Sequence, residues 1–246
     1  MLNRSARRDI LELVIGYVLV LAAVWTPRPW SGVLFYVGLA WVALVTLLSG
    51  ESVRCLGLTF EGLERSLWIV AGAAAMALIA SLVAVRFDTL RSPLSNSAQG
   101  LHAWGYVLWA FVQQFLLQNY FLSRLLRILP SKMSAVAAAG VLFAIAHIPN
   151  PLLTAVTLIW GTVACLLFLR YRNLYTLGAA HAILGLCIAF TIPNAIHHQM
   201  HVGLGYLRYR QRPKPDQRSQ SNQMVSTNEW VIAEAKSRYC ALQARP

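Results

Sequence analysis

The sequence predicts an all-α fold, a polytopic transmembrane bundle of seven or eight helices. Hydrophobic residues make up 57% of the 246 residues and charged residues only 12%, about half the share found in soluble domains. The mean hydropathy is +0.54. The apolar residues gather into runs of bilayer-spanning length, and basic residues flank those runs. These observations indicate an integral, multi-pass membrane protein.

The net charge of +12 needs an explanation. A basic balance of this size can indicate nucleic-acid binding. Here, however, the basic residues lie mainly at the ends of apolar runs, where they orient helices in a membrane. We therefore expect membrane lipids as partners and no nucleic acid.

Seven apolar runs are predicted to span the membrane. In chain order they cover residues 10–26, 31–49, 68–85, 104–122, 133–148, 152–169 and 173–192. The first follows several arginines, as in a signal peptide, but lacks a small-x-small cleavage site, so we expect a retained helix that ends at Pro27. Glu12 lies near its start, where a carboxylate is expected to snorkel to the interface. The charged segment 50–67 follows the second run and is expected to lie along the membrane surface.

The later runs are separated by polar or helix-breaking residues. The third is rich in Ala and Gly, which lets helices pack closely, and a polar loop at 86–103 precedes the fourth. Pro149 and Pro151 separate the fifth run from the sixth, which ends at Arg170 and Arg172. Both kinds of boundary are typical of connections between membrane helices.

The N-terminus is expected on the cytoplasmic side. Lys and Arg number about ten in the N-terminal segment and the loops after even-numbered spans, against about three in the other loops. Seven spans would leave the basic segment 208–218 outside, so either residues 193–207 dip back into the membrane or the tail departs from the rule. Residues 1–210 are the expected membrane domain, and the polar residues 211–246 are expected to form a disordered tail.

The fourth span is unusual because it carries four amides. They are Gln113, Gln114, Gln118 and Asn119. A membrane interior has no water to satisfy such groups, so they need partners inside the protein. The best partners in the sequence are His147 in the fifth span and His181 in the seventh.

A depth estimate places these groups at similar levels. Counted from the basic ends at about 1.5 Å per residue, Gln114, His181 and His147 lie roughly 15, 14 and 22 Å deep. These depths overlap near the middle of a hydrocarbon core of about 30 Å. We therefore expect one polar site. The alternative is that the amides join helices by hydrogen bonds while backbone carbonyls satisfy the histidines.

Three segments together resemble one protein family. They are FVQQFLLQNYFLSRLL at 111–126, FAIAH at 143–147 and LGAAHAILG at 177–185. In this order they resemble the CPBP family of intramembrane proteases, also called the Abi or CAAX-prenyl-protease family. The family pattern is EExxxR, then FxxxH, then HxxxN or HxxxD. The likeness covers about 104–192.

The departures from the family pattern lie where its chemistry is expected. Gln113 and Gln114 stand at the two family glutamates, Gln118 at the arginine, and Gly185 at the final Asn or Asp. Only Phe143, His147 and His181 match. A glutamine still forms hydrogen bonds, but it has no carboxylate to accept a proton. None of the nine acidic residues lies in spans four to seven, so a neutral histidine is the remaining candidate base.

The resemblance implies an intramembrane endopeptidase that acts on membrane-embedded or lipid-modified polypeptides. The candidate catalytic residues are Gln113, Gln114, His147 and His181. The candidate substrate-binding residues are Gln118, Asn119 and Phe143. His147 and His181 are also the candidate ligands if the site holds a divalent metal such as zinc, and the alternative is that it holds none.

Whether the chain is an enzyme stays open at this point. One hypothesis is a divergent protease, and another is a protease-derived protein that binds a membrane peptide or lipid without cleaving it. A small transporter is less favoured, because intramembrane charges and broken helix pairs are nearly absent.

Overall fold

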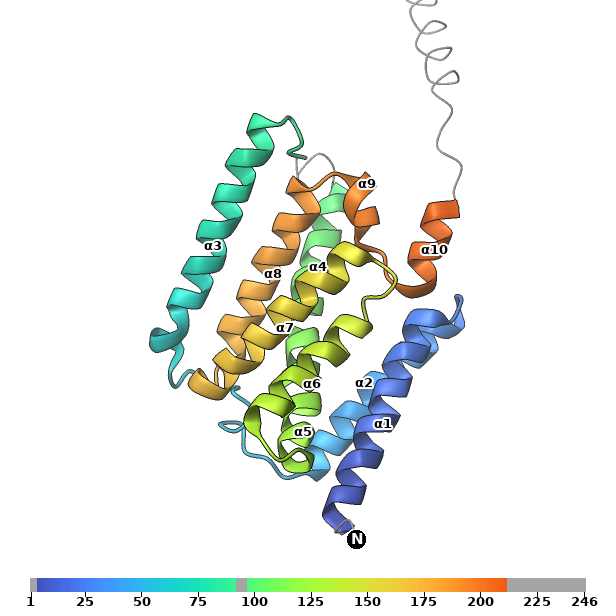
Figure 1. Cartoon of the computed structure of the whole chain (residues 1–246), viewed down its shortest axis with the longest axis vertical. Helices are drawn as coiled ribbons and strands as arrows, with labels where there is room; N and C mark the ends of the chain where they lie inside the picture. Colours follow the sequence, from blue (N-terminus) through green and yellow to red (C-terminus); the bar gives the residue numbers. More distant parts are fainter. Residues whose placement is uncertain (1–3, 92–96, 212–246) are drawn as a thin grey trace, which may run out of the picture. The chain divides into compact units, whose positions relative to one another are not determined.

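The computed structural model describes residues 4–91 and 97–211, and within them every regular element is helical. The helices are α1 (Arg4–Trp25), α2 (Trp30–Leu48), α3 (Leu63–Arg86), α4 (Ser97–Phe115), the π-helix η1 (Leu116–Leu122), α5 (Ser123–Ile128), α6 (Lys132–Ile145), α7 (Pro151–Tyr171), α8 (Leu174–Thr191), α9 (Asn194–His197), the 3₁₀-helix η2 (His198–Met200) and α10 (Gly203–Gln211) (Figure 1). The predicted all-α fold is confirmed. The described residues up to Arg210 form one compact unit. Apart from Gln211, the expected disordered tail lies outside the described residues.

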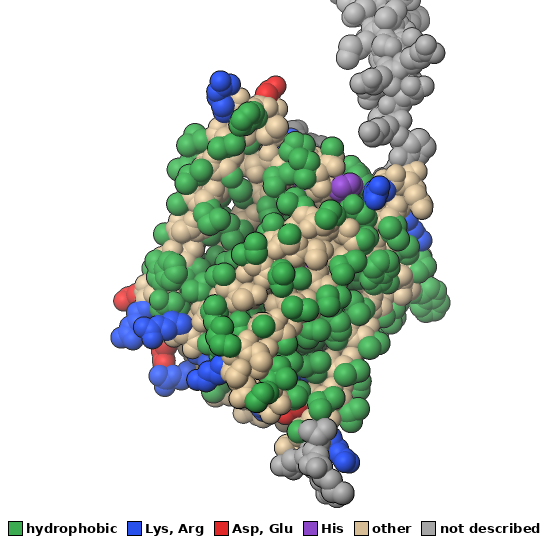
Figure 2. Space-filling view, viewed as in Figure 1, with side chains coloured by type: hydrophobic (Ala, Val, Ile, Leu, Met, Phe, Trp, Pro, Cys, Tyr) green, Lys and Arg blue, Asp and Glu red, His purple; other side chains and the backbone are tan. Residues whose placement is uncertain are grey.

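The protein is an integral membrane protein. Helices α2, α3, α7 and α8 are long and apolar enough to cross a membrane, and α6 is a shorter apolar helix. Many large hydrophobic side chains on these helices are exposed, among them Leu47, Ile79 and Ile159. Figure 2 shows hydrophobic side chains spread over the visible face and charged side chains near helix ends. Such a surface suits lipid rather than water.

Three helices begin at least five residues before their apolar runs, and α1 does so at Arg4 rather than 10. Helix α3 starts at Leu63 rather than 68, directly after Gly62, which has a φ of 73°. Helix α4 starts at Ser97 rather than 104, so the polar loop expected over 86–103 is shorter. Apolar runs mark the part of a helix that is in lipid, whereas the helix itself continues into the polar region.

The segment between α2 and α3, which we expect to lie along the membrane surface over 50–67, packs on the protein through hydrogen bonds. The Asn119 side chain donates to the Leu56 carbonyl at 3.1 Å, and the Leu174 amide donates to the Gly57 carbonyl at 2.9 Å. Gly57 has a φ of 67°, and a Cβ there would lie 2.8 Å from the Arg172 carbonyl oxygen. The loop therefore needs glycine at 57 to dock on the α7–α8 connection.

Two asparagines set the starts of the helices that follow the fifth span. The Asn150 side chain accepts from the Leu153 amide at the start of α7, where Pro151 takes the first helical position. The Asn173 side chain accepts from the Thr176 amide at the start of α8. Both are ordinary N-caps. The second one fixes the register of α8, and with it the position of His181 two turns later.

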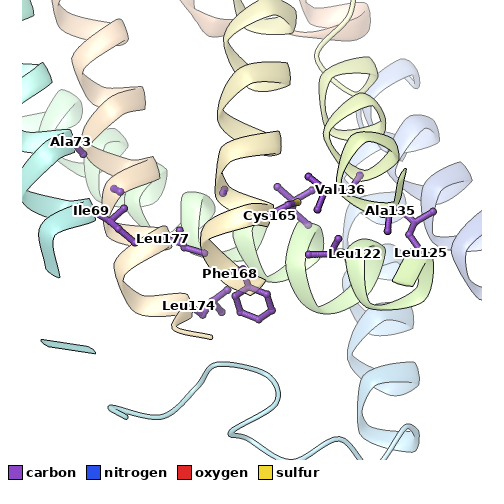
Figure 3. Close-up of a cluster of buried hydrophobic side chains, with 14 residues drawn as sticks. Ile69, Ala73, Leu122, Leu125, Ala135, Val136, Cys165, Phe168, Leu174 and Leu177 are labelled. Carbon is purple, nitrogen blue, oxygen red and sulfur yellow. The ribbon is translucent and has the colours of Figure 1, made fainter. Parts of the chain in front are cut away.

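Helix α8 packs against α3 and α4, α6 against α7, and α1 against α2 (Figure 1). Figure 3 shows the main core cluster between these helices, with labelled residues Ile69, Ala73, Leu122, Leu125, Ala135, Val136, Cys165, Phe168, Leu174 and Leu177. Helix α4 comes close to α8 at Gly178, where a Cβ would overlap the Phe111 ring. This close approach brings the amides of α4 to the histidine of α8.

Helix α1 is joined to α5 by ion pairs. Glu12 is 8% exposed and pairs with Arg124, which is 2% exposed, at 2.9 Å. Asp9 pairs with Arg127 at 2.9 Å. The expectation that Glu12 snorkels to the interface is therefore wrong, because a buried arginine on a neighbouring helix satisfies it.

Candidate functional site

The amide-bearing helix changes its winding beside the polar residues. Helix α4 ends at Phe115 and continues as the seven-residue π-helix η1. Gln118, Asn119 and Tyr120 lie in this segment and are buried. A π-helical turn widens the backbone and is common at functional sites. It gives these three consecutive side chains different partners.

A chain of hydrogen bonds links two amides to one histidine. Gln118 Nε2 donates to Gln114 Oε1 at 3.1 Å. Gln114 Nε2 in turn lies 3.1 Å from Nδ1 of His181. All three side chains are buried. The predicted meeting of the amides of the fourth span with a histidine of the seventh is therefore present.

The partners of the two histidines give them complementary hydrogen-bonding states. His147 Nδ1 lies 2.7 Å from the Phe143 carbonyl oxygen; because a carbonyl only accepts, Nδ1 carries the proton and Nε2 has the free lone pair. His181 Nδ1 faces the nitrogen of the Gln114 amide, which donates, so neutral His181 carries its proton on Nε2. One imidazole thus offers an acceptor and the other a donor.

Aromatic rings hold the two imidazoles in place. The Phe143 ring centroid lies 4.9 Å from that of His147 and 6.0 Å from that of His181, in both cases edge to face. The Trp160 ring centroid lies 6.2 Å from that of His181. A Cβ at Gly161 would come within 2.9 Å of the Phe143 ring. Phe143 therefore packs tightly between α7 and the two histidines.

Both histidines line a cavity of about 840 Å³. Its wall contains residues of α1, α2, α4, η1, α6, α7, α8 and the segment after α9, and most of them are apolar. Among the described residues, Arg28 is the single charged one in this lining, and the polar groups Gln113 and Tyr106 also line it. A mostly apolar cavity of this size with a few polar groups is typical of a ligand-binding site.

The candidate residues divide into two groups by position. Gln113, Phe143, His147 and His181 line the cavity. Gln114, Gln118 and Asn119 lie outside the lining, and their amides bond within the protein: Gln114 to His181, Gln118 to Gln114, and Asn119 to the Leu56 carbonyl. These positions fit a role in holding the site together. They fit less well the direct substrate contact that we expect for Gln118 and Asn119.

The donor set does not fit a zinc site. Within residues 4–91 and 97–211, no group of three or more His, Cys, Asp or Glu side chains is placed to hold a metal ion. Zinc in proteins takes three or four such ligands, whereas the cavity offers two imidazoles. His197, His198 and His201, beyond α8, form no such group either.

Sequence reasoning missed Tyr106 and Trp160, which line the cavity beside the histidines. A signal for Tyr106 exists: it stands seven residues before Gln113, and residues seven apart share a helix face. For Trp160 the neighbour on the same face is Thr157, three residues earlier and also in the lining, and a threonine in an apolar helix is a weak signal because its hydroxyl can bond to its own helix backbone.

Comparison with known proteins is consistent with this site. Residues 101–187 match the family model described as type II CAAX prenyl endopeptidase Rce1-like. The match runs from α4 to α8 and includes the amides, Phe143 and both histidines. It confirms the resemblance to the CPBP or CAAX-protease-like family. No curated protein matches, and no solved structure matches.

Proposed function

We propose that this chain, which is CAAX-protease-like over residues 101–187, is an intramembrane endopeptidase for membrane-embedded or lipid-modified polypeptides. The observation that carries the proposal is the pair of cavity-lining histidines in complementary states, His147 with a free Nε2 lone pair and His181 with a protonated Nε2. Peptide hydrolysis needs a base for water and a donor for the oxyanion, and this pair supplies both.

The reaction proceeds through a tetrahedral intermediate. His147 Nε2 takes a proton from water while the water oxygen bonds to the peptide carbonyl carbon. The carbonyl oxygen becomes an oxyanion and accepts a hydrogen bond from His181 Nε2–H. The carbon–nitrogen bond then breaks, and the leaving nitrogen receives the proton from His147. The products are a carboxyl group and an amine, and both imidazoles end neutral.

The glutamines orient rather than transfer protons. Gln114 holds His181 in the tautomer that donates from Nε2, and Gln118 holds Gln114. Gln113 lines the cavity, where its amide is available to a substrate carbonyl or to the attacking water. The apolar wall accommodates the lipid chain or transmembrane segment of the substrate.

A second candidate function is binding without cleavage. Two observations favour it. The glutamate positions of the family pattern hold Gln113 and Gln114, and the carboxylates of α1 are paired with Arg124 and Arg127 rather than directed to the site. A protein with this cavity and no effective base would hold a membrane peptide or lipid and release it unchanged.

We also propose that the N-terminus faces the cytoplasm, on the basis of the Lys and Arg distribution. A cysteine introduced at Ser5 should react with a membrane-impermeant maleimide in inverted vesicles and stay protected in right-side-out cells. The opposite pattern would reverse the orientation.

Purified protein in nanodiscs, tested against prenylated and transmembrane peptides, distinguishes the two functions. The variants are His147→Ala, His181→Ala and the double variant Gln113→Glu/Gln114→Glu, with His201→Ala as the matched control because His201 is exposed. Wild-type cleavage that both cavity variants lose and the control keeps supports the peptidase. Peptide binding without cleavage, combined with cleavage by the double glutamate variant, supports the binding protein.

A further inference from the structure

In the cavity wall, the side chain of Tyr106 on α4 packs directly against Gly185 on α8. Gly185 lies four residues after His181 on α8, on the same helix face, and it lines the cavity. A Cβ at position 185 would overlap the hydroxyl and the adjoining ring carbons of Tyr106 from α4. The Tyr106 hydroxyl therefore occupies the space that a side chain at 185 would fill.

Helix α4 presents this hydroxyl on the same face as Gln113. The two residues are seven positions apart, and both line the cavity. The hydroxyl thus lies one turn of α8 away from His181, in a wall that is otherwise mostly apolar. A phenol both donates and accepts a hydrogen bond, and a donor in an apolar cavity binds a carbonyl more strongly than it does in water.

We infer that the Tyr106 hydroxyl is a substrate-contacting group, a hydrogen-bond donor to the peptide carbonyl held beside His181. It supplies from α4 the polar group that Gly185 does not supply from α8. This inference rests on the proposed function, because it requires a polypeptide in the cavity. It assigns the site a second donor besides His181 Nε2–H.

The competing explanation is that Tyr106 only fills space between α4 and α8. Tyr106→Phe separates the two, because it removes the hydroxyl and keeps the ring that packs on Gly185. If the hydroxyl contacts the reacting carbonyl, we expect the kcat of Tyr106→Phe to fall roughly 100-fold, as for loss of one oxyanion donor, with little change in KM. Tyr36→Phe is the matched control, since Tyr36 is 71% exposed on α2.

Moving the polar side chain from position 106 on α4 to position 185 on α8 tests the inference directly. Tyr106→Ala makes room for a side chain at 185, so Tyr106→Ala/Gly185→Asn returns a polar group to the same space from α8. We expect this double variant to cleave at least ten times faster than Tyr106→Ala. Tyr106→Ala/Gly185→Leu, which restores volume alone, should cleave no faster than Tyr106→Ala. Thermal unfolding of each variant shows whether it is folded.

Each outcome decides the inference. If the wild type cleaves and Tyr106→Phe cleaves equally well, the hydroxyl contacts no reacting group and the inference is overturned while the proposed function stands. If the wild type binds a prenylated peptide without cleaving it, the affinity is the readout, and Tyr106→Phe should weaken it at least fivefold; equal affinity overturns the inference. If the wild type neither cleaves nor binds any peptide, the proposed function fails and the inference fails with it.

Discussion

Gln114 Nε2 lies 3.1 Å from Nδ1 of His181, and this contact joins α4 to α8. Gln114 is fully buried and His181 is 6% exposed, so water does not replace the bond when it is lost. The contact has a chemical consequence as well as a structural one. It determines which nitrogen of His181 holds the proton, and so whether this imidazole meets a ligand as a donor or as an acceptor.

Replacing Gln114 should therefore destabilise the protein. In Gln114→Leu, His181 Nδ1 and Gln118 Nε2 both lose a partner, and we expect a loss of about 1–3 kcal/mol in the free energy of unfolding. Unfolding in mixed detergent micelles measures it. Gln113→Leu is the control, because Gln113 faces the cavity, and its stability should stay near that of the wild type. Equal losses in the two variants would contradict the role given to the buried contact.

Removing one member of the Glu12–Arg124 ion pair between α1 and α5 should lower the free energy of unfolding strongly. Among the described residues, Arg124→Met leaves the buried Glu12 carboxylate with the exposed Arg8 as its remaining ion-pair partner, and we expect a loss of about 3–5 kcal/mol. Glu12→Leu/Arg124→Met removes both charges and should lose much less. A double-mutant cycle on unfolding free energy measures the coupling. Additive losses would mean that the two side chains do not interact.

Acidification should destabilise the region beyond the end of α8. His197 is 2% exposed, its Nε2 lies 2.7 Å from the Arg91 guanidinium, and its Nδ1 accepts from the Met200 amide at 3.2 Å. Burial, and secondarily the charge of Arg91, lowers the pKa of His197 in the folded state. The unfolded chain therefore binds a proton at a pH where the folded chain does not.

The sign of the pH effect follows from that lowered pKa. Above the ordinary histidine pKa of about 6.5 both states are neutral at this position and stability is unaffected. As the pH falls from there toward the lower folded-state pKa, stability is lost. Between pH 7.5 and pH 5, the melting temperature should fall less for His197→Gln than for the wild type. For His201→Gln, in which an exposed histidine is replaced, it should fall as much as for the wild type. Parallel curves for wild type and His197→Gln would refute the assignment.

Treatment with a metal chelator should change neither cleavage nor peptide binding in the cavity. Two imidazoles are too few ligands for a tightly held zinc ion, and the mechanism above assigns the base to His147. Cleavage or peptide binding is measured before and after 1,10-phenanthroline treatment, with metal content determined on the same sample. Loss of function that stoichiometric zinc restores would show that zinc is bound in the cavity and would contradict this prediction.

The helices and the central polar contact were predictable because a membrane constrains both strongly. Apolar runs must be long to cross a bilayer, and buried amides must find partners, which points from Gln114 to His181. The π-helix η1 was not predictable, since it arises from a local change in winding that no residue pattern marks. The Glu12–Arg124 pair and the docking of Leu56 on Asn119 depend on contacts between distant parts of the chain. The spacing of seven residues from Gln113 marks the helix face of Tyr106, but its position against Gly185 depends on how α4 packs on α8.

Close packing of α4 on α8 should be necessary for the site, and Gly178 tests this. A Cβ at 178 would overlap the Phe111 ring, so Gly178→Ala must move that ring or separate the helices, with an expected loss of about 1–3 kcal/mol. Gly72→Ala on α3 is the matched control, since a Cβ there meets no atom within 4 Å. The same helix separation would lengthen the Gln114–His181 contact, so cleavage or peptide binding should fall in Gly178→Ala and not in Gly72→Ala. If Gly178→Ala unfolds like the wild type and keeps full function, the cavity does not depend on this contact between α4 and α8.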